Sequence, residues 1–270
     1  MLVPFNATVG VESAHAFGDA LFNIPLIIAL SKHHNSAITV TTKPQYNDAF
    51  ENIDCITEII HINEMGHGVE KLQSIGKKHI YQLTQNITWL EQIKIEPQLS
   101  LIESPLRTAQ KLGINIDPRP IFIPRHHEIQ STEKYASQQP TIAIEAEARS
   151  GQSWANNQHI QQIIDKYKQT HRILWLSITN APPNTISLHH ISRRQNIMCL
   201  RHAEKFYCVG SGLFCASLAL EQKYQPKQII CLWEDSMYKY KSTLSKYTWH
   251  NNLQIIDNPQ QLTQHLMVTR

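Results

Sequence analysis

The feature of this sequence that most restricts its fold is a repeated alternation of short apolar segments with longer amphipathic segments. In the first half, strands are expected at residues 2–6, 37–41, 57–62, 79–83 and 120–123, and helices at residues 19–33, 43–51, 69–75 and 104–112. This order of elements is typical of parallel sheets whose strands are joined by crossover helices. We therefore expect an α/β fold.

The alternation stops once, in a polar segment between Pro124 and Pro140 that has almost no large apolar side chains. It restarts with expected strands at residues 141–145, 172–178, 205–209 and 228–233, and with expected helices at residues 157–169, 193–203, 213–220 and 259–268. A chain of 270 residues exceeds the usual size of one domain. We expect one domain at 1–130, a linker at 131–140, a second domain at 141–256 and a closing helix at 257–270.

The composition excludes several classes of protein. Lys and Arg number 25 against 22 Asp and Glu, and this net charge of +3 falls short of the basic stripe typical of nucleic-acid-binding proteins.

The longest apolar cluster, residues 21–30, is about half as long as a membrane-spanning helix, and the N-terminus does not resemble a signal peptide. The five cysteines include no C-x-x-C pair, which favours reduced thiols. We expect a cytoplasmic location, with which peripheral attachment to the inner membrane is compatible.

The 15 histidines do not form a metal-binding pattern. Three adjacent pairs, at residues 33–34, 126–127 and 189–190, direct their rings apart on a helix or a strand. No H-x-x-x-H or H-E-x-x-H spacing occurs, and zinc sites need convergent ligands. We therefore expect surface histidines and no bound metal.

Three short motifs indicate function. In the first, Gly18 and Asp19 end a loop before an expected helix, and Pro25 falls within the first two turns of that helix. A proline this deep is unusual because it removes a backbone hydrogen bond. On the residues alone, Asp19 is either an N-cap or a functional carboxylate.

The second motif, residues 145–154, follows an expected strand, and its Trp154 fits either a binding loop or a core aromatic. The third motif is Gly210-Ser211-Gly212-Leu213, a loop of small residues between an expected strand and an expected helix. Free backbone N–H groups at such a helix start suit a diphosphate, although a plain strand-to-helix turn has the same pattern.

In order and spacing, these motifs resemble the ADP-heptose:lipopolysaccharide heptosyltransferase family, of the glycosyltransferase family nine type, over roughly residues 15–235. The first helix of that family opens with G-D followed six residues later by Pro. Its second motif reads H-P-G-A and then S-x-x-K-x-W-P, and its third reads G-x-D-S/T-G-x-x-H-L-A. This chain departs from the pattern at Glu145 for the first His, Gln152 for the Lys, Gly210 for the Asp and Cys215 for the second His.

The resemblance implies a GT-B fold, which has two Rossmann-like parallel-sheet domains facing across a cleft. It also implies an inverting, metal-independent and cofactor-free transfer of a heptose or hexose. The donor would be a nucleotide-diphosphate sugar and the acceptor a hydroxyl of a bacterial surface glycan, as in lipopolysaccharide biosynthesis. Asp19 would be the catalytic base. The donor diphosphate would lie against Gly210, Ser211, Gly212, Leu213, Arg149 and Gln152, and the remaining cleft residues would be Gly18, Ser150, Trp154 and Glu145.

Two alternatives stay open. A phage-type glycosyltransferase acting on a modified DNA base would need a local basic face, for which the candidates are Lys77, Lys78, Arg193, Arg194 and the lysines at 239–246. A sugar-nucleotide-binding protein without transferase activity would explain why the Lys, Asp and His of the family pattern are missing.

Overall fold

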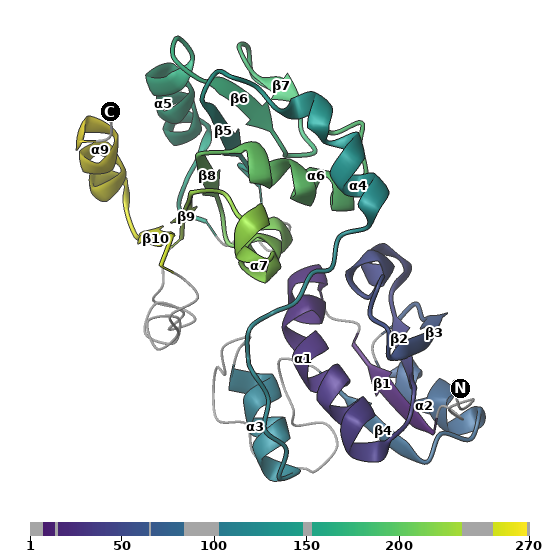
Figure 1. Cartoon of the computed structure of the whole chain (residues 1–270). Coiled ribbons are helices and arrows are strands. Elements are labelled where there is room, and N and C mark those ends of the chain that lie inside the picture. The colour runs from purple at the N-terminus through teal and green to yellow at the C-terminus, as the bar shows by residue number, and fades with distance from the viewer. Residues whose placement is uncertain are drawn as a thin grey trace. The chain divides into compact units, whose positions relative to one another are not determined.

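The computed structural model describes residues 8–13, 16–64, 66–83, 103–147, 153–233 and 251–268. The chain divides into two compact units, Met1–Ile123 and Pro124–Arg270, which are described separately below (Figure 1). The expected strand at 2–6 and the predicted site residues Arg149, Ser150 and Gln152 lie outside the described residues.

The first unit is built on a parallel four-stranded sheet with the order β3-β2-β1-β4. The strands are β1 (Val9–Glu12), β2 (Ile38–Thr42), β3 (Ile56–His61) and β4 (His79–Gln82). The helices are α1 (Phe17–His34), α2 (His67–Ser74) and α3 (Glu103–Lys111), with a 3₁₀ helix, η1 (Pro44–Ala49). Helix α2 approaches β1 so closely that a Cβ atom on Gly10 would lie 2.7 Å from Leu72 Cδ2.

Three elements of the first unit differ from prediction. The strand β1, at Val9–Glu12, was not predicted. The helix expected at 43–51 is the shorter 3₁₀ helix η1. The segment 120–123, expected as a strand, pairs with none of the described strands, and its Ile121 N–H donates instead to Leu21 O of α1 at 3.4 Å. The Leu21 carbonyl lacks the usual helical hydrogen bond from the residue four positions later, because that residue is Pro25, which has no N–H. The proline therefore frees an acceptor that fixes the end of this unit, and Phe122 is buried beside it.

The second unit contains a parallel six-stranded sheet with the order β10-β9-β8-β5-β6-β7. Its strands are β5 (Thr141–Ile144), β6 (Arg172–Trp175), β7 (Ile186–Ser187), β8 (Lys205–Cys208), β9 (Gln228–Leu232) and β10 (Leu253–Ile256). Its helices are α4 (His126–Ser131), α5 (Asn157–Tyr167), α6 (Arg193–Cys199), α7 (Gly212–Ala219) and α9 (Pro259–Val268), with the 3₁₀ helices η3 (Glu133–Tyr135), η4 (Leu200–His202) and η5 (Gln222–Tyr224).

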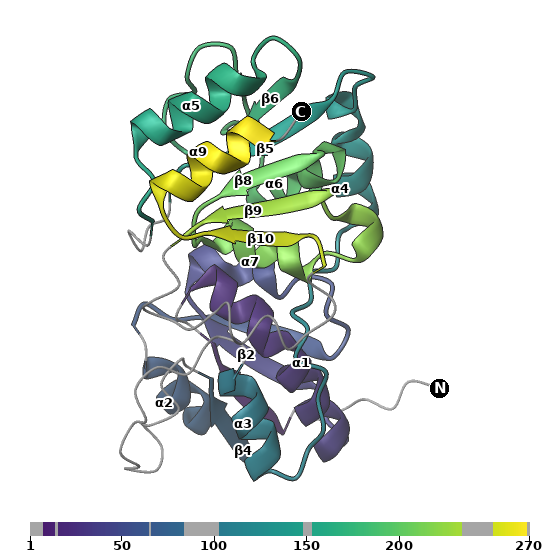
Figure 2. The same ribbon diagram turned by 90° about the vertical axis from the view of Figure 1, so that its left-hand side faces the viewer.

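The core of the second unit lies between the sheet and the helices on its two faces. Helices α5 and α9 cover one face, and α6 and α7 lie on the other (Figure 2). Alternate residues of the strands, including Ile142, Ile144 and Ile230, pack with Ile163 of α5 and Leu262 of α9. These strands are apolar on both faces, as expected of a parallel sheet covered by helices. The closing helix expected at 259–268 is confirmed, whereas β7 and β10 were not predicted.

The segment 124–140 is not a bare linker. It contains α4 and η3 and packs within the second unit. Glu128 of α4 and Arg194 of α6 form an ion pair with Nε–Oε1 2.5 Å and Nη2–Oε2 3.1 Å, and both side chains are 4% exposed. The predicted boundary placed residues 126–130 in the first domain, whereas α4 belongs to the second unit. The buried surface of α4 is polar, so the segment lacks the apolar spacing of a packed helix.

Within the described residues, no helix is both long enough and apolar enough to cross a membrane.

Candidate nucleotide-sugar site

Each of the described sheets has a topological switch point. This is the place at a central strand where strands that come later in the sequence lie on both of its sides. In the second unit it lies between β5 and β8, because β6 follows on one side of β5 while β8 pairs on the other. In the first unit it lies between β1 and β4. Ligands of open α/β sheets bind beyond the carboxyl ends of the strands at such points.

Two predicted residues meet at the switch point of the second unit. Glu145 directly follows β5, and its N–H donates to Tyr207 O of β8 at 2.9 Å. Ser211 lies just beyond β8, and its hydroxyl donates to Glu145 Oε2. The structure therefore brings together the second and third sequence motifs.

Ser211 is also the N-cap of α7. Its Oγ accepts the N–H of Phe214 at 3.1 Å, as an N-cap side chain does. Gly212 and Leu213 are the first two helical residues, so their N–H groups have no acceptor within the helix. Gly210, Ser211 and Gly212 are half-buried, which leaves this helix start partly open to solvent.

Glu145 lies in an environment that disfavours a negative charge. The side chain is buried, and this desolvation raises the pKa of the Glu145 carboxyl to about 8, with the nearby Glu147 adding to the rise and the Ser211 hydroxyl opposing it. The carboxyl is therefore mostly neutral at pH 7. A neutral acid beside the start of α7 does not repel an anionic ligand.

Trp154 is hydrogen-bonded at the carboxyl-terminal edge of the same sheet. Its indole N–H donates to Ile256 O at the end of β10 at 2.8 Å, and the hydroxyl of the preceding Ser153 donates to Leu232 O at the end of β9 at 2.9 Å. The Trp154 ring also packs against the core of α5 and the sheet. These contacts are those of an anchoring aromatic, the structural alternative raised from the sequence.

Cys215 stands where the family pattern has a His, and in this chain the position is buried. Cys215 lies on α7 and is buried, 5% exposed, so its side chain belongs to the core.

Asp19 lies at the switch point of the first unit. It is the third residue of α1, whose N-cap is Ala16, so Asp19 is not the N-cap. Its side chain is buried, 7% exposed. One turn further on, Asn23 Nδ2 donates to Ser13 Oγ at 3.1 Å and to Leu83 O at 3.4 Å, the residues that follow β1 and β4. Residues four apart share a helix face, so Asp19 lies on the face of α1 directed at this edge.

The sequence reasoning missed a second buried carboxylate in this unit. Glu12 ends β1, and its Oε1 accepts Gly66 N–H at 2.6 Å while its Oε2 accepts Gln82 Nε2 at 3.0 Å. Both oxygens are therefore used to hold the start of α2 and the end of β4. The one available signal was a Glu closing an apolar strand.

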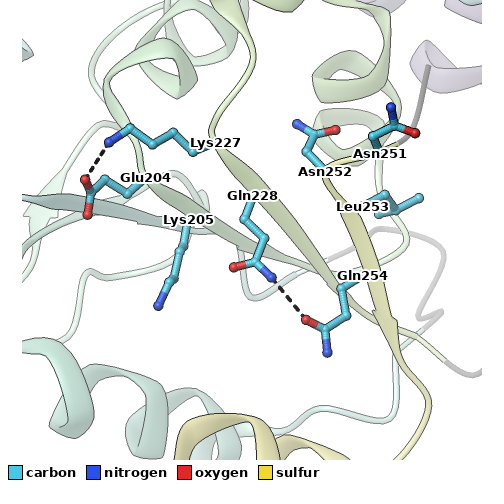
Figure 3. Close-up of a pocket in the computed structure, with 8 residues that line it drawn as sticks. All are labelled: Glu204, Lys205, Lys227, Gln228, Asn251, Asn252, Leu253 and Gln254. Carbon is cyan, nitrogen blue, oxygen red and sulfur yellow. Dashed lines mark hydrogen bonds and ion pairs between the residues drawn. The ribbon is translucent and has the colours of Figure 1, made fainter. Parts of the chain in front are cut away.

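The sheet of the second unit also has a cavity at its opposite, amino-terminal edge. It has a volume of about 490 Å³ and is lined by Leu253 and by polar side chains at and just before the starts of β8, β9 and β10 (Figure 3). Four of its polar side chains form two pairs, Lys227–Glu204 at 2.7 Å and Gln228–Gln254 at 3.1 Å. It contains none of the predicted site residues. In the described part of the chain, no three His, Cys, Asp or Glu side chains are grouped so that they could hold a metal ion.

No family model matches this chain, and no curated protein matches its sequence. Its fold does match solved structures. A family 9 glycosyl transferase from Veillonella parvula aligns with a TM-score of 0.67 and 9% identity over 95% of this chain and 88% of its own. The ADP-heptose lps heptosyltransferase II of E. coli aligns with a TM-score of 0.62 and 13% identity over 92% of this chain and 89% of its own.

An epimerase matches the chain as well. The UDP-GlcNAc 2-epimerase of Methanocaldococcus jannaschii, solved with UDP-GlcNAc and UDP, aligns with a TM-score of 0.51 and 9% identity over 97% of this chain and 93% of its own. Together these matches confirm the predicted GT-B fold and the structural resemblance to family nine glycosyltransferases. Because transferases and an epimerase share the fold, the reaction has to be argued from the residues of the site.

Proposed function

We propose that this protein is a glycosyltransferase that moves a sugar from a nucleotide-diphosphate donor to an acceptor hydroxyl. The observation that carries this proposal is the start of α7 at the β5/β8 switch point. The N–H groups of Gly212 and Leu213 lie there without helical acceptors, beside the neutral carboxyl of Glu145. A helix N-terminus favours phosphate through its dipole and its free donors.

The donor diphosphate would bind at residues 210–213, where these amides would also stabilise the charge that develops on the departing nucleoside diphosphate. Arg149 and Gln152 stay predictions as further donor contacts, because they lie outside the described residues. The proposed transfer uses the amides and needs no metal for this charge. The donor sugar is proposed to be a heptose or a hexose.

Asp19 is the proposed catalytic base. It would take the proton of the acceptor hydroxyl as that oxygen attacks the anomeric carbon, which inverts the configuration there. Its burial and its place on the switch-point face of α1 suit a carboxylate that contacts substrate. Two of the solved relatives are a family 9 glycosyl transferase and an ADP-heptose heptosyltransferase, which makes a bacterial surface glycan the proposed acceptor.

A donor screen tests this function. The melting temperature would be measured with ADP-, UDP-, GDP- and CMP-sugars, and release of the free nucleotide would be followed with and without glycan acceptors. A ligand at about 100 times its Kd stabilises a protein by about 2.7 kcal/mol, which is a measurable shift. We expect a shift from at least one diphosphate sugar and none from the monophosphate CMP-sugar. No shift from any diphosphate sugar would contradict the proposal.

A sugar-nucleotide-binding protein without turnover is the second candidate. The burial of Cys215 favours it, because the position that carries His in the family pattern belongs here to the core. A melting shift without transfer or hydrolysis would select this candidate.

The structure weakens the DNA-base alternative. Arg194, one of the residues proposed for a basic face, is buried in its ion pair with Glu128. Lys77 is 10% exposed and lies 4.0 Å from Glu58. Neither side chain can contribute much to a basic surface for nucleic acid.

A further inference from the structure

The buried carboxyl of Glu145 lies where an anionic ligand would bind, so its charge matters for that ligand. It directly follows β5 and contacts the N-cap residue of α7 through the Ser211 hydroxyl. Among the described residues, Ser211 is the hydrogen-bond partner of this carboxyl. An ionised carboxylate here would repel a diphosphate at the same helix start.

The Ser211 hydroxyl connects the two elements. It accepts the N–H of Phe214 and can donate its single proton only once, and that proton goes to Glu145 Oε2. The rotamer of Ser211 is therefore fixed from both sides. Because Glu145 N–H is also bonded to Tyr207 O, and Ala146 N–H to Ser177 Oγ at 2.8 Å, the backbone that carries the carboxyl is held as well.

From this geometry we propose that Glu145 is a proton-linked positioning residue of the donor site: its side chain holds Ser211 at the start of α7, its neutral form admits a nucleoside diphosphate, and loss of its proton excludes that ligand. This inference rests on the proposed function and adds to it a coupling between donor binding and proton binding.

Among the described groups near Glu145, the proton of Glu145 itself is the main source of a coupling between donor binding and proton binding. Glu147 is exposed on the same loop and disfavours ionisation of Glu145. The neighbouring Cys208, Cys215 and Cys231 are buried thiols, and burial raises the pKa of Cys208 well above its usual value. Arg149 lies outside the described residues.

Titration calorimetry with ADP, UDP and GDP between pH 7 and 9 tests the coupling. Only the protonated fraction binds, and with a Glu145 pKa of about 8 the apparent Kd of the wild type is expected to rise about tenfold from pH 7 to pH 9. Binding near pH 8 should take up protons from the buffer. In Glu145→Gln, which cannot ionise, the Kd should change much less over this range and the proton uptake should disappear.

Two further variants make the test specific. Glu147→Gln makes the same charge change two residues away and should keep the pH dependence, with its midpoint at slightly lower pH because a repelling charge is gone. Ser211→Ala removes the hydrogen bond that favours the ionised form, so its midpoint should move to higher pH. Equal pH dependence in the wild type and Glu145→Gln would overturn the proposal.

A stability measurement covers the case in which Glu145→Gln binds poorly because it is misfolded. Between about pH 4.5 and pH 8 the folded wild type keeps the Glu145 proton that the unfolded chain has released, so the free energy of unfolding of the wild type, relative to that of Glu145→Gln, falls as pH rises through this range. Glu145→Gln should lack this contribution, and the same pH dependence of unfolding in both proteins would overturn the inference. If no nucleoside diphosphate binds the wild type at any pH, the proposed function itself fails, whereas binding with the same pH dependence in both proteins rejects the role of Glu145 alone.

Discussion

At the scale of single residues, the two candidate sites depend on carboxyl groups in different settings. Asp19 lies in the first turn of α1, where the helix dipole favours a negative charge. Glu145 lies in a buried setting that favours the neutral acid. The sequence indicated both positions, but it could not show the protonation of Glu145, because burial and a contact made across the sheet decide it.

Replacing Asp19 with Asn tests the proposed base. Asn keeps the shape of the side chain but cannot accept a proton, so kcat for sugar transfer should fall by about 10²- to 10⁴-fold. The Kd for the donor should stay nearly constant, because the donor is proposed to bind the second unit. Both values would be measured by product release and by calorimetry.

Asp54→Asn is the matched control for this variant, since Asp54 is exposed in the same unit and undergoes the same chemical change. It should transfer sugar at the wild-type rate. If Asp19→Asn also retained that rate, Asp19 would not be the base.

At the scale of elements, the order of strands and helices could largely be predicted because apolar periodicity reports which faces are buried. Two of the exceptions have local causes. The segment 120–123 bonds to a helix carbonyl that Pro25 leaves free, and α4 is held by the buried Glu128–Arg194 pair. A pairing between residues 66 positions apart leaves no periodic signal in the sequence.

Arg194→Met tests the attachment of α4. It leaves Glu128 buried without its partner, although Glu128 Oε2 still accepts Arg125 N–H at 2.7 Å. The free energy of unfolding should fall by about 3–5 kcal/mol, as measured by urea denaturation. The double variant Glu128→Met/Arg194→Met should recover much of this loss, because two apolar side chains leave no buried charge.

Arg193→Met makes the same change at the neighbouring, less buried position and should cost much less. A similar loss in Arg193→Met and Arg194→Met would show that the buried pair does not hold α4.

At the scale of the whole molecule, two parallel α/β units and their likeness to solved GT-B proteins agree with the fold predicted from the alternation of elements. The site was only partly predictable. Ser211 and the start of α7 followed from a loop of small residues between a strand and a helix. The contact of Ser211 with Glu145 joins residues 66 positions apart through the strand order, and the hydrogen bonds of Asn23 to Ser13 and Leu83, one turn beyond Asp19, depend on the strand order of the first sheet.

The central claim is that a nucleoside diphosphate binds at the start of α7, and the Kd of ADP, UDP and GDP for Gly212→Asp tests it most directly. An acidic residue in the first turn suits the helix dipole, so α7 should keep its fold. The added carboxylate should repel the diphosphate and weaken the Kd of the best nucleotide at least tenfold, whereas Gln222→Asp, on the exposed 3₁₀ helix η5, should leave it unchanged. Unchanged affinity in a folded Gly212→Asp protein would contradict the account.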